Sequence, residues 1–227
     1  MAEKRRLPLP QGNFFYLLAS LLLIFLLYPF VQRNVLGVRL LDIILSAILL
    51  SGIYAVSQKK QLFIIALVLA VPTLAVHWSK YFFSDPFEFF AGESMTALFF
   101  IFTGGIILIH VFRDDEVTAN KIAGAICVYL LIGLTWGIFF ALIEDFQPGS
   151  FLIGHVEVAR MEEKIPQMMY YSFVNLTTLG YGDITPLAPP ARTFSIVEAI
   201  IGQMYLVVLV ARLVGLHIVH STKKHSG

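Results

Sequence analysis

Six apolar stretches, each about twenty residues long, constrain the fold of this chain more than any other feature of its sequence. A helix needs ~20 mainly apolar residues to cross ~30 Å of hydrocarbon, because each residue advances it by about 1.5 Å. The stretches are roughly 14–32, 38–57, 61–79, 93–112, 121–143 and 194–219. The pattern predicts an all-α membrane protein with six transmembrane helices.

The composition agrees with a membrane protein and excludes several other classes. Apolar residues make up 58% of the chain and charged residues 14%, which is about half the charged share of soluble domains. The net charge of +1 gives no basic field that would attract nucleic acid. One cysteine, Cys127, permits neither an intrachain disulfide nor a cysteine metal cage. No catalytic constellation recurs at a readable spacing, so we expect neither an enzyme nor a resident cofactor.

The distribution of lysine and arginine predicts the orientation in the membrane. The first apolar stretch is too long for a signal peptide and lacks a cleavage site, so we expect it to remain as a span. With both termini cytoplasmic, nine lysines and arginines lie inside and six outside, which agrees with the positive-inside rule. The sequence therefore predicts a multi-pass protein of the plasma (inner) membrane, with residues 144–193 outside.

A short helix and a glycine-rich loop lie within that outer excursion. Pro166 suits the first turn of a helix, and Gln167–Leu176 is apolar but too short to cross a membrane. We expect a half-helix that dips into the membrane and returns. The negative end of its peptide dipoles would then point towards the membrane interior, where it favours a cation.

The loop that follows, "TTLGYG", has the composition of a backbone that lines a water path. Gly180 and Gly182 stand one residue apart, and left-handed backbone costs glycine almost nothing. Alternation of right-handed and left-handed residues turns successive carbonyl groups to one side. The carbonyls of Thr178, Leu179, Gly180 and Tyr181, with the Thr178 hydroxyl, can then replace water around a dehydrated cation.

The heptapeptide "TTLGYGD", Thr177–Asp183, with a short helix before it and a long apolar span after it, resembles the signature of the potassium channel family. Roughly the last 110 residues resemble the family's outer helix, pore helix, selectivity filter and inner helix. The resemblance implies a potassium-selective channel without an arginine-rich fourth span, similar to bacterial six-span members. It assigns the filter to Thr178, Leu179, Gly180, Tyr181 and Gly182, with K⁺ at the first four.

The same resemblance assigns supporting residues around the filter. Asp183 matches the acid at the outer mouth, and Tyr170 and Tyr171 occupy the place of an aromatic pair on the pore helix. Further support is expected from Asn175 and Thr177. Three positions depart from the common pattern: Leu179 replaces valine, the aromatic pair lacks tryptophan, and Val174 stands where some bacterial relatives carry a buried glutamate.

The single copy of the loop predicts the assembly. A filter of this type needs four loops around one axis, so we expect a homotetramer whose partners are three further copies, K⁺ ions and membrane lipids. Gly133 and Gly137 on the fifth stretch permit a close helix approach, either by the sixth span or by a neighbouring chain. Two alternatives stay open, namely a component of a potassium uptake transporter and a non-conducting accessory subunit.

Three residues of the last stretch are candidates for gating or for lining a cavity. Glu198 is an ionisable group within a span, and we expect it behind the filter with Asn175 or Thr177 as its hydrogen-bond partner. The substitution Glu198→Gln is expected to change the open probability. Gly202 lies where the family often has a hinge glycine, with tight helix packing as the alternative. Gln203 can line a water-filled cavity below the filter.

The fourth stretch argues against voltage gating, because its only arginine, Arg113, stands at its cytoplasmic end. Steep voltage dependence needs about 3–4 charges per subunit. The predicted domains are a cytoplasmic N-terminus at 1–13, a four-span peripheral domain without gating charges at 14–112, a pore domain at 113–219 and a cytoplasmic tail at 220–227. Within the pore domain the predicted elements are an outer helix at 121–143, a pore helix at 166–177, the filter at 178–182 and an inner helix at 194–219.

Overall fold

The structure is a computed structural model that describes residues 13–31, 35–57, 59–79, 86–113, 117–154 and 161–225. Most of the predicted N-terminal segment, residues 1–12, lies outside the described residues. The helices of the described part are α1 (Phe14–Val31), α2 (Val35–Val56), α3 (Lys60–Ser79), α4 (Pro86–Arg113), α5 (Ala119–Phe146), α6 (Met161–Leu176) and α7 (Pro189–His225). Two short strands, β1 (Phe151–Ile153) and β2 (Ile184–Pro186), flank α6 and the loop after it.

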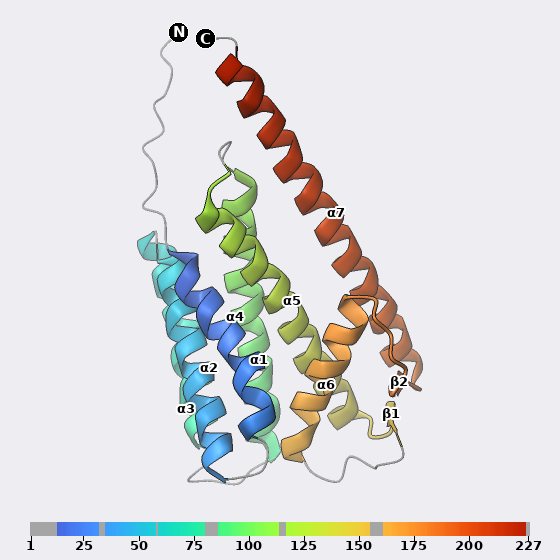
Figure 1. Ribbon diagram of the computed structural model, residues 1–227. Coiled ribbons are helices and arrows are strands. Elements are labelled where there is room, and N and C mark those ends of the chain that lie inside the picture. The colour runs from blue at the N-terminus through green and yellow to red at the C-terminus, as the bar shows by residue number, and fades with distance from the viewer. Residues whose placement is uncertain are drawn as a thin grey trace.

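The helices form two neighbouring groups that share α5. Helices α1 to α4 lie side by side, and α5 packs on α1 and α4 with one face and on α6 and α7 with another (Figure 1). The short α6 is held between α5 and the long α7 (Figure 1). One apolar core runs through α1 to α5, and a smaller core joins α5, α6, the two strands and the start of α7. This arrangement places the loop after α6 at the edge of the molecule.

The lengths of the helices support membrane insertion. Among the described residues, four helices are long and apolar enough to span a membrane: Lys60–Ser79, Phe90–Phe112, Ala119–Phe146 and Pro189–Gly215. The apolar segments of the first two helices, Phe14–Leu27 and Leu40–Val56, are shorter. The fold is therefore a mostly helical membrane fold. Helix α7 has 37 residues and is about 55 Å long at about 1.5 Å per residue, which is longer than the hydrocarbon core.

Helix α6, for which we keep the name pore helix that the sequence predicted, begins earlier than expected. It starts at Met161, so Pro166 lies inside the helix and not in its first turn. A proline there removes one hydrogen bond to the preceding turn. The helix ends at Leu176, one residue before the predicted end. The outer and inner helices likewise extend a few residues beyond the predicted 121–143 and 194–219.

Two glycines of α5 accommodate the pore helix. A Cβ atom added to Gly137 would lie 2.7 Å from the Met169 Cα, and one added to Gly133 would overlap the Phe173 ring. Both residues that approach belong to α6. The close approach predicted at this glycine pair is therefore present, but its partner is the pore helix of the same chain, which the sequence analysis had not considered.

A two-stranded antiparallel sheet joins the end of α5 to the segment after the glycine-rich loop, and the sequence analysis had not predicted it. Strands β1 and β2 are antiparallel, with Phe151 opposite Pro186 and Ile153 opposite Ile184. The buried Glu144 carboxylate of α5 accepts hydrogen bonds from the Gly149 N–H at 2.8 Å and the Phe151 N–H at 3.0 Å. These contacts fix the turn that leads into β1.

Candidate functional site

The loop from Thr178 to Gly182 has an alternating backbone. Positive φ angles occur at Thr178 (59°), Gly180 (61°) and Gly182 (77°), and not at Leu179 and Tyr181 between them. The left-handed conformation predicted for the two glycines is confirmed. Thr178 was not predicted to adopt it, because the left-handed conformation costs a residue with a Cβ atom about 1–2 kcal/mol of conformational free energy. The alternation therefore extends from Thr178 to Gly182.

The amide groups of this loop point back to the pore helix. The Thr178 N–H donates to the Asn175 carbonyl at 2.9 Å, and the Leu179 N–H donates to the Val174 carbonyl at 2.9 Å. The Gly180 N–H shares the Val174 carbonyl at 3.2 Å. Within the described part of the chain, no hydrogen bond reaches the carbonyl oxygens of residues 178–181. The first three amide groups of the loop are therefore satisfied by the pore helix, and these four carbonyl oxygens stay available to a ligand.

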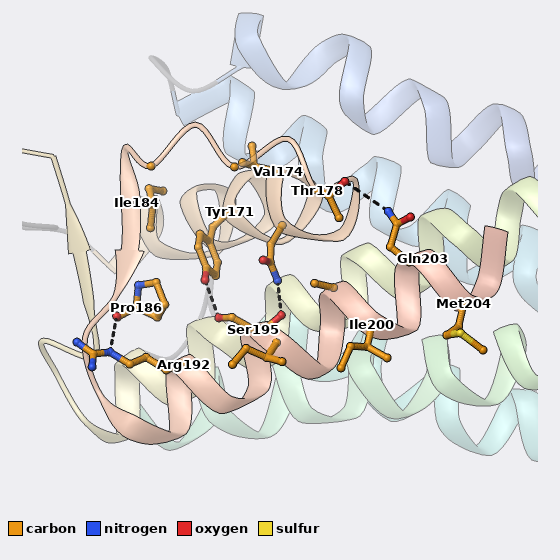
Figure 2. A pocket seen from close by; sticks show the side chains of 15 residues that line it. Tyr171, Val174, Thr178, Ile184, Pro186, Arg192, Ser195, Ile200, Gln203 and Met204 are labelled. Carbon is orange, nitrogen blue, oxygen red and sulfur yellow. Dashed lines mark hydrogen bonds between the residues drawn. The ribbon is translucent and has the colours of Figure 1, made fainter. Parts of the chain in front are cut away.

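An open groove runs between this loop and one face of α7. Its volume is about 920 Å³, and its lining comes from the loop, from the pore helix and from α7 (Figure 2). Thr178 lies at one end, where the Gln203 Nε2 donates to the Thr178 Oγ1 at 3.4 Å (Figure 2). Leu179 and Tyr181 are 55% and 66% exposed. The side chains of these two loop residues are thus open to the surroundings of the single chain.

Behind the loop, Glu198 of α7 is fully buried, with an exposed fraction of 0%. Its carboxyl group is hydrogen-bonded to the Ser172 hydroxyl and, at 2.6 Å, to the Asn175 Nδ2. The position behind the loop and the partner Asn175 agree with the prediction. Thr177 is not a partner, because its hydroxyl donates to the Phe173 carbonyl of its own helix at 2.6 Å. Ser172 was missed, since periodicity alone does not show which residue of α6 faces α7.

A second polar contact between α6 and α7 lies one turn nearer the start of α7. The Tyr171 hydroxyl and the Ser195 Oγ are 2.6 Å apart (Figure 2), and the Asn175 Nδ2 donates to the Ser195 carbonyl at 2.7 Å (Figure 2). The ring of Tyr171 also contacts Phe140 and Phe151 edge-on. Tyr171 therefore joins the pore helix to α5, β1 and α7. Ser195 carries no sequence signal that would have identified it.

The end of the loop is fixed by Asp183. Its Oδ2 accepts a hydrogen bond from the Tyr170 hydroxyl at 2.7 Å, and its carbonyl accepts one from the Gly154 N–H at 3.0 Å. The hydrogen bond to Asp183 raises the pKa of Tyr170 to about 12. The phenol therefore remains a donor at neutral pH. Both residues were named from the sequence, and the structure brings them into direct contact.

Gly202 lies where α7 crosses the end of the pore helix. A Cβ atom at this position would be 2.5 Å from the Leu176 carbonyl oxygen and 2.7 Å from the Leu176 Cδ1. The glycine therefore permits a close contact between α7 and the last residue of α6. This contact agrees with the packing alternative for Gly202, and its role as a hinge stays a prediction.

Comparison with known proteins covers the part of the chain that contains this site. The family model described as "Ion channel" matches residues 128–216, which extend from α5 to α7. The two pore potassium channel c of Oryza sativa subsp. japonica is 35% identical over 86 residues, which are 38% of this chain and 16% of the relative. The chain thus matches about a sixth of the length of that curated relative. No solved structure matches the chain significantly.

Proposed function

We propose, from the premise that residues 128–216 belong to the potassium channel family, that this protein is a channel that conducts K⁺ passively down its electrochemical gradient. The observation that carries the proposal is the alternating backbone of residues 178–182, in which the first three N–H groups bond to the pore helix and the carbonyls of residues 178–181 accept no hydrogen bond within the described part of the chain. Such carbonyls can replace the hydration shell of a dehydrated cation. The name of the rice relative supports K⁺ as that cation.

The ion sites are assigned to the carbonyl groups of Thr178, Leu179, Gly180 and Tyr181. Gly182 completes the alternation, and Asp183 with its partner Tyr170 forms the outer mouth. The Thr178 hydroxyl lies at the inner end, beside Gln203 on α7. Gln203 is then the polar side chain nearest to a hydrated ion that waits below the filter.

A complete filter requires four copies of the chain. The described structure supplies one loop, of which Thr178, Gly180 and Gly182 line the open groove. Along the same side, α7 exposes a row of apolar side chains, with Ile196, Ile200 and Met204 being 62%, 57% and 56% exposed. We assign the inner part of this surface to contacts with neighbouring copies around a fourfold axis, because rings of four carbonyls close only in that arrangement.

The remaining helices complete the proposed topology. As the sequence predicted, we assign six spans to the chain. Both termini then lie on the cytoplasmic side, and the segment 144–193, which connects the spans α5 and α7, lies on the outer side. Helices α1 to α4 then form the peripheral domain, which has no series of arginines on α4. Moving one charge through the field contributes only about 2.3 kcal/mol per 100 mV, so this domain does not act as a steep voltage sensor.

Flux measurements on liposomes that contain the purified protein test the proposal. We expect K⁺ efflux that exceeds Na⁺ efflux and that barium blocks. Equal permeation of the two ions would contradict the selectivity, and the absence of any flux would favour a non-conducting accessory subunit. Cross-linking of the reconstituted protein should give a tetramer as the largest product.

A glycine substitution tests the role of the loop itself. Gly180→Ala adds no contact within 4 Å, but it places a Cβ atom on left-handed backbone. The cost of about 1–2 kcal/mol per residue becomes about 4–8 kcal/mol over four subunits. We expect loss of K⁺ selectivity or of flux. The matched control is Gly105→Ala in α4, which also has open space around it and should conduct like the wild type.

A further inference from the structure

Glu198 is the one carboxyl group that joins the inner helix to the pore helix in the described part of the chain. It lies on α7 with no exposed surface, and its two oxygens face Ser172 and Asn175 on α6. Asn175 in turn accepts the Thr178 N–H, which is the first amide of the filter. A change at Glu198 therefore reaches the filter through one intervening residue.

The hydrogen bonds around Glu198 allow its proton to be counted. Asn175 has two amide hydrogens, and it donates to the Glu198 Oε2 at 2.6 Å and to the Ser195 carbonyl at 2.7 Å. The Ser172 Oγ is within hydrogen-bond distance of two oxygens, the Gly133 carbonyl at 2.7 Å and the Glu198 Oε1. A hydroxyl group carries a single proton, and a backbone carbonyl oxygen carries none. Both contacts can carry a proton of their own only if Ser172 donates to the Gly133 carbonyl and Glu198 supplies the proton between Oε1 and the Ser172 Oγ.

The charges around Glu198 agree with this count. The titratable side chains of α5 and α6 that interact with it electrostatically are Tyr129 and Tyr171, which are neutral phenols near pH 7. Within the described residues Glu198 forms no salt bridge, and the Lys164–Asp145 pair lies at the other end of α6. A buried carboxylate without a cationic partner would be costly in a membrane span.

We propose that Glu198 is a neutral carboxylic acid whose O–H donates to Ser172 while Ser172 donates to the Gly133 carbonyl, and that this bridge positions the pore helix and the filter. The proposal rests on the channel function proposed above. Glu198 is a positioning residue, because it acts on the filter through Asn175 and touches no ion site. In this chain the buried acid belongs to the inner helix. The pore-helix position at which some bacterial relatives carry a buried glutamate is Val174 here.

The proposed proton revises the effect expected for Glu198→Gln. A glutamine amide can donate to Ser172 and accept from Asn175, as the neutral acid does. We expect this variant to conduct within about threefold of the wild type, since both hydrogen bonds are kept. Glu198→Met has a similar length but keeps neither bond. Its K⁺ flux should fall about tenfold, because the Asn175 and Ser172 groups lose a buried partner.

Infrared difference spectroscopy of the reconstituted tetramer tests the proton directly. Subtracting the Glu198→Gln spectrum from that of the wild type should reveal the C=O stretch of a protonated carboxylic acid, which shifts in D₂O. If the difference spectrum instead shows a carboxylate band that the wild type has and the variant lacks, the proton assignment is overturned. Wild-type flux in Glu198→Met would overturn the positioning role. A carboxylic-acid band in a wild-type protein that conducts no ions would support the protonation of Glu198 and contradict the channel function. Failure of the protonation proposal and failure of the proposed function can therefore be told apart.

Discussion

The substitution Gly202→Ala separates the two roles that the sequence leaves open for this residue, because they predict effects of opposite sign. An added Cβ atom would be 2.5 Å from the Leu176 carbonyl oxygen and 2.7 Å from the Leu176 Cδ1. The side chain of Leu176 can move, but its carbonyl is part of the backbone at the end of α6 and moves only with that backbone. Overpacking of this kind costs about 1–3 kcal/mol.

A glycine that serves only as a hinge gives the reverse result. Replacing it by alanine inside an exposed helix stabilises the protein by about 1 kcal/mol, because alanine loses less backbone entropy. The assay is the thermal unfolding midpoint of the purified tetramer, followed by tryptophan fluorescence. A loss of 1–3 kcal/mol corresponds to a fall of roughly 2–12 °C in Tm for a chain of this length.

The matched control lies on the same helix. Gly215→Ala meets nothing within 4 Å, so it should leave Tm unchanged or raise it slightly. If Gly202→Ala unfolds at or above the wild-type temperature, as the control does, the argument from close packing is refuted. Changed gating at an unaltered Tm would then assign Gly202 to a hinge.

Two further substitutions test contacts at opposite sides of the pore helix. Because Asp183 raises the pKa of Tyr170 to about 12, this phenol stays protonated through its usual titration range near 10, and its bond is lost only as pH rises through about 12. External pH 7–10 should therefore leave K⁺ flux constant, whereas Tyr170→Phe should show faster decay of flux throughout this range. Phe25 on α1 meets Phe173 edge-on, with ring centroids 4.9 Å apart. Phe25→Ala should destabilise the protein by about 1 kcal/mol or more, while Phe15→Ala, at a 48% exposed position, should change Tm less.

The sequence predicted best what depends on single residues or on long segments. The apolar stretches give the helix ends within seven residues, because length and hydropathy act locally. Gly180 and Gly182 were expected on left-handed backbone for the same reason. Thr178 was missed, since a threonine adopts this conformation only when the surroundings compensate for it. One compensating contact is the hydrogen bond to the Asn175 carbonyl from the Thr178 N–H, which lies just beyond the last residue of α6.

The short two-stranded sheet shows where local signals are too weak. Each strand has three residues, too few for a readable alternation of polar and apolar side chains. What fixes β1 is the Glu144 carboxylate, which bonds to amides five and seven residues further along the chain. In the sequence, Glu144 stands directly after the predicted stretch 121–143, a position that fits a membrane interface as readily as a turn.

Contacts between helices depend on how each helix is rotated about its axis, and a sequence pattern fixes that rotation only within a broad face. Gly133 and Gly137 indicated that a helix approaches α5 closely, but a pair of small residues does not identify what approaches. The pore helix takes that place, and its ridge of Met169 and Phe173 sets its rotation. Ser172, next to Phe173, is thereby directed between the Gly133 carbonyl and Glu198. The glycine that admits the pore helix thus also supplies the acceptor that leaves Glu198 as the donor to Ser172.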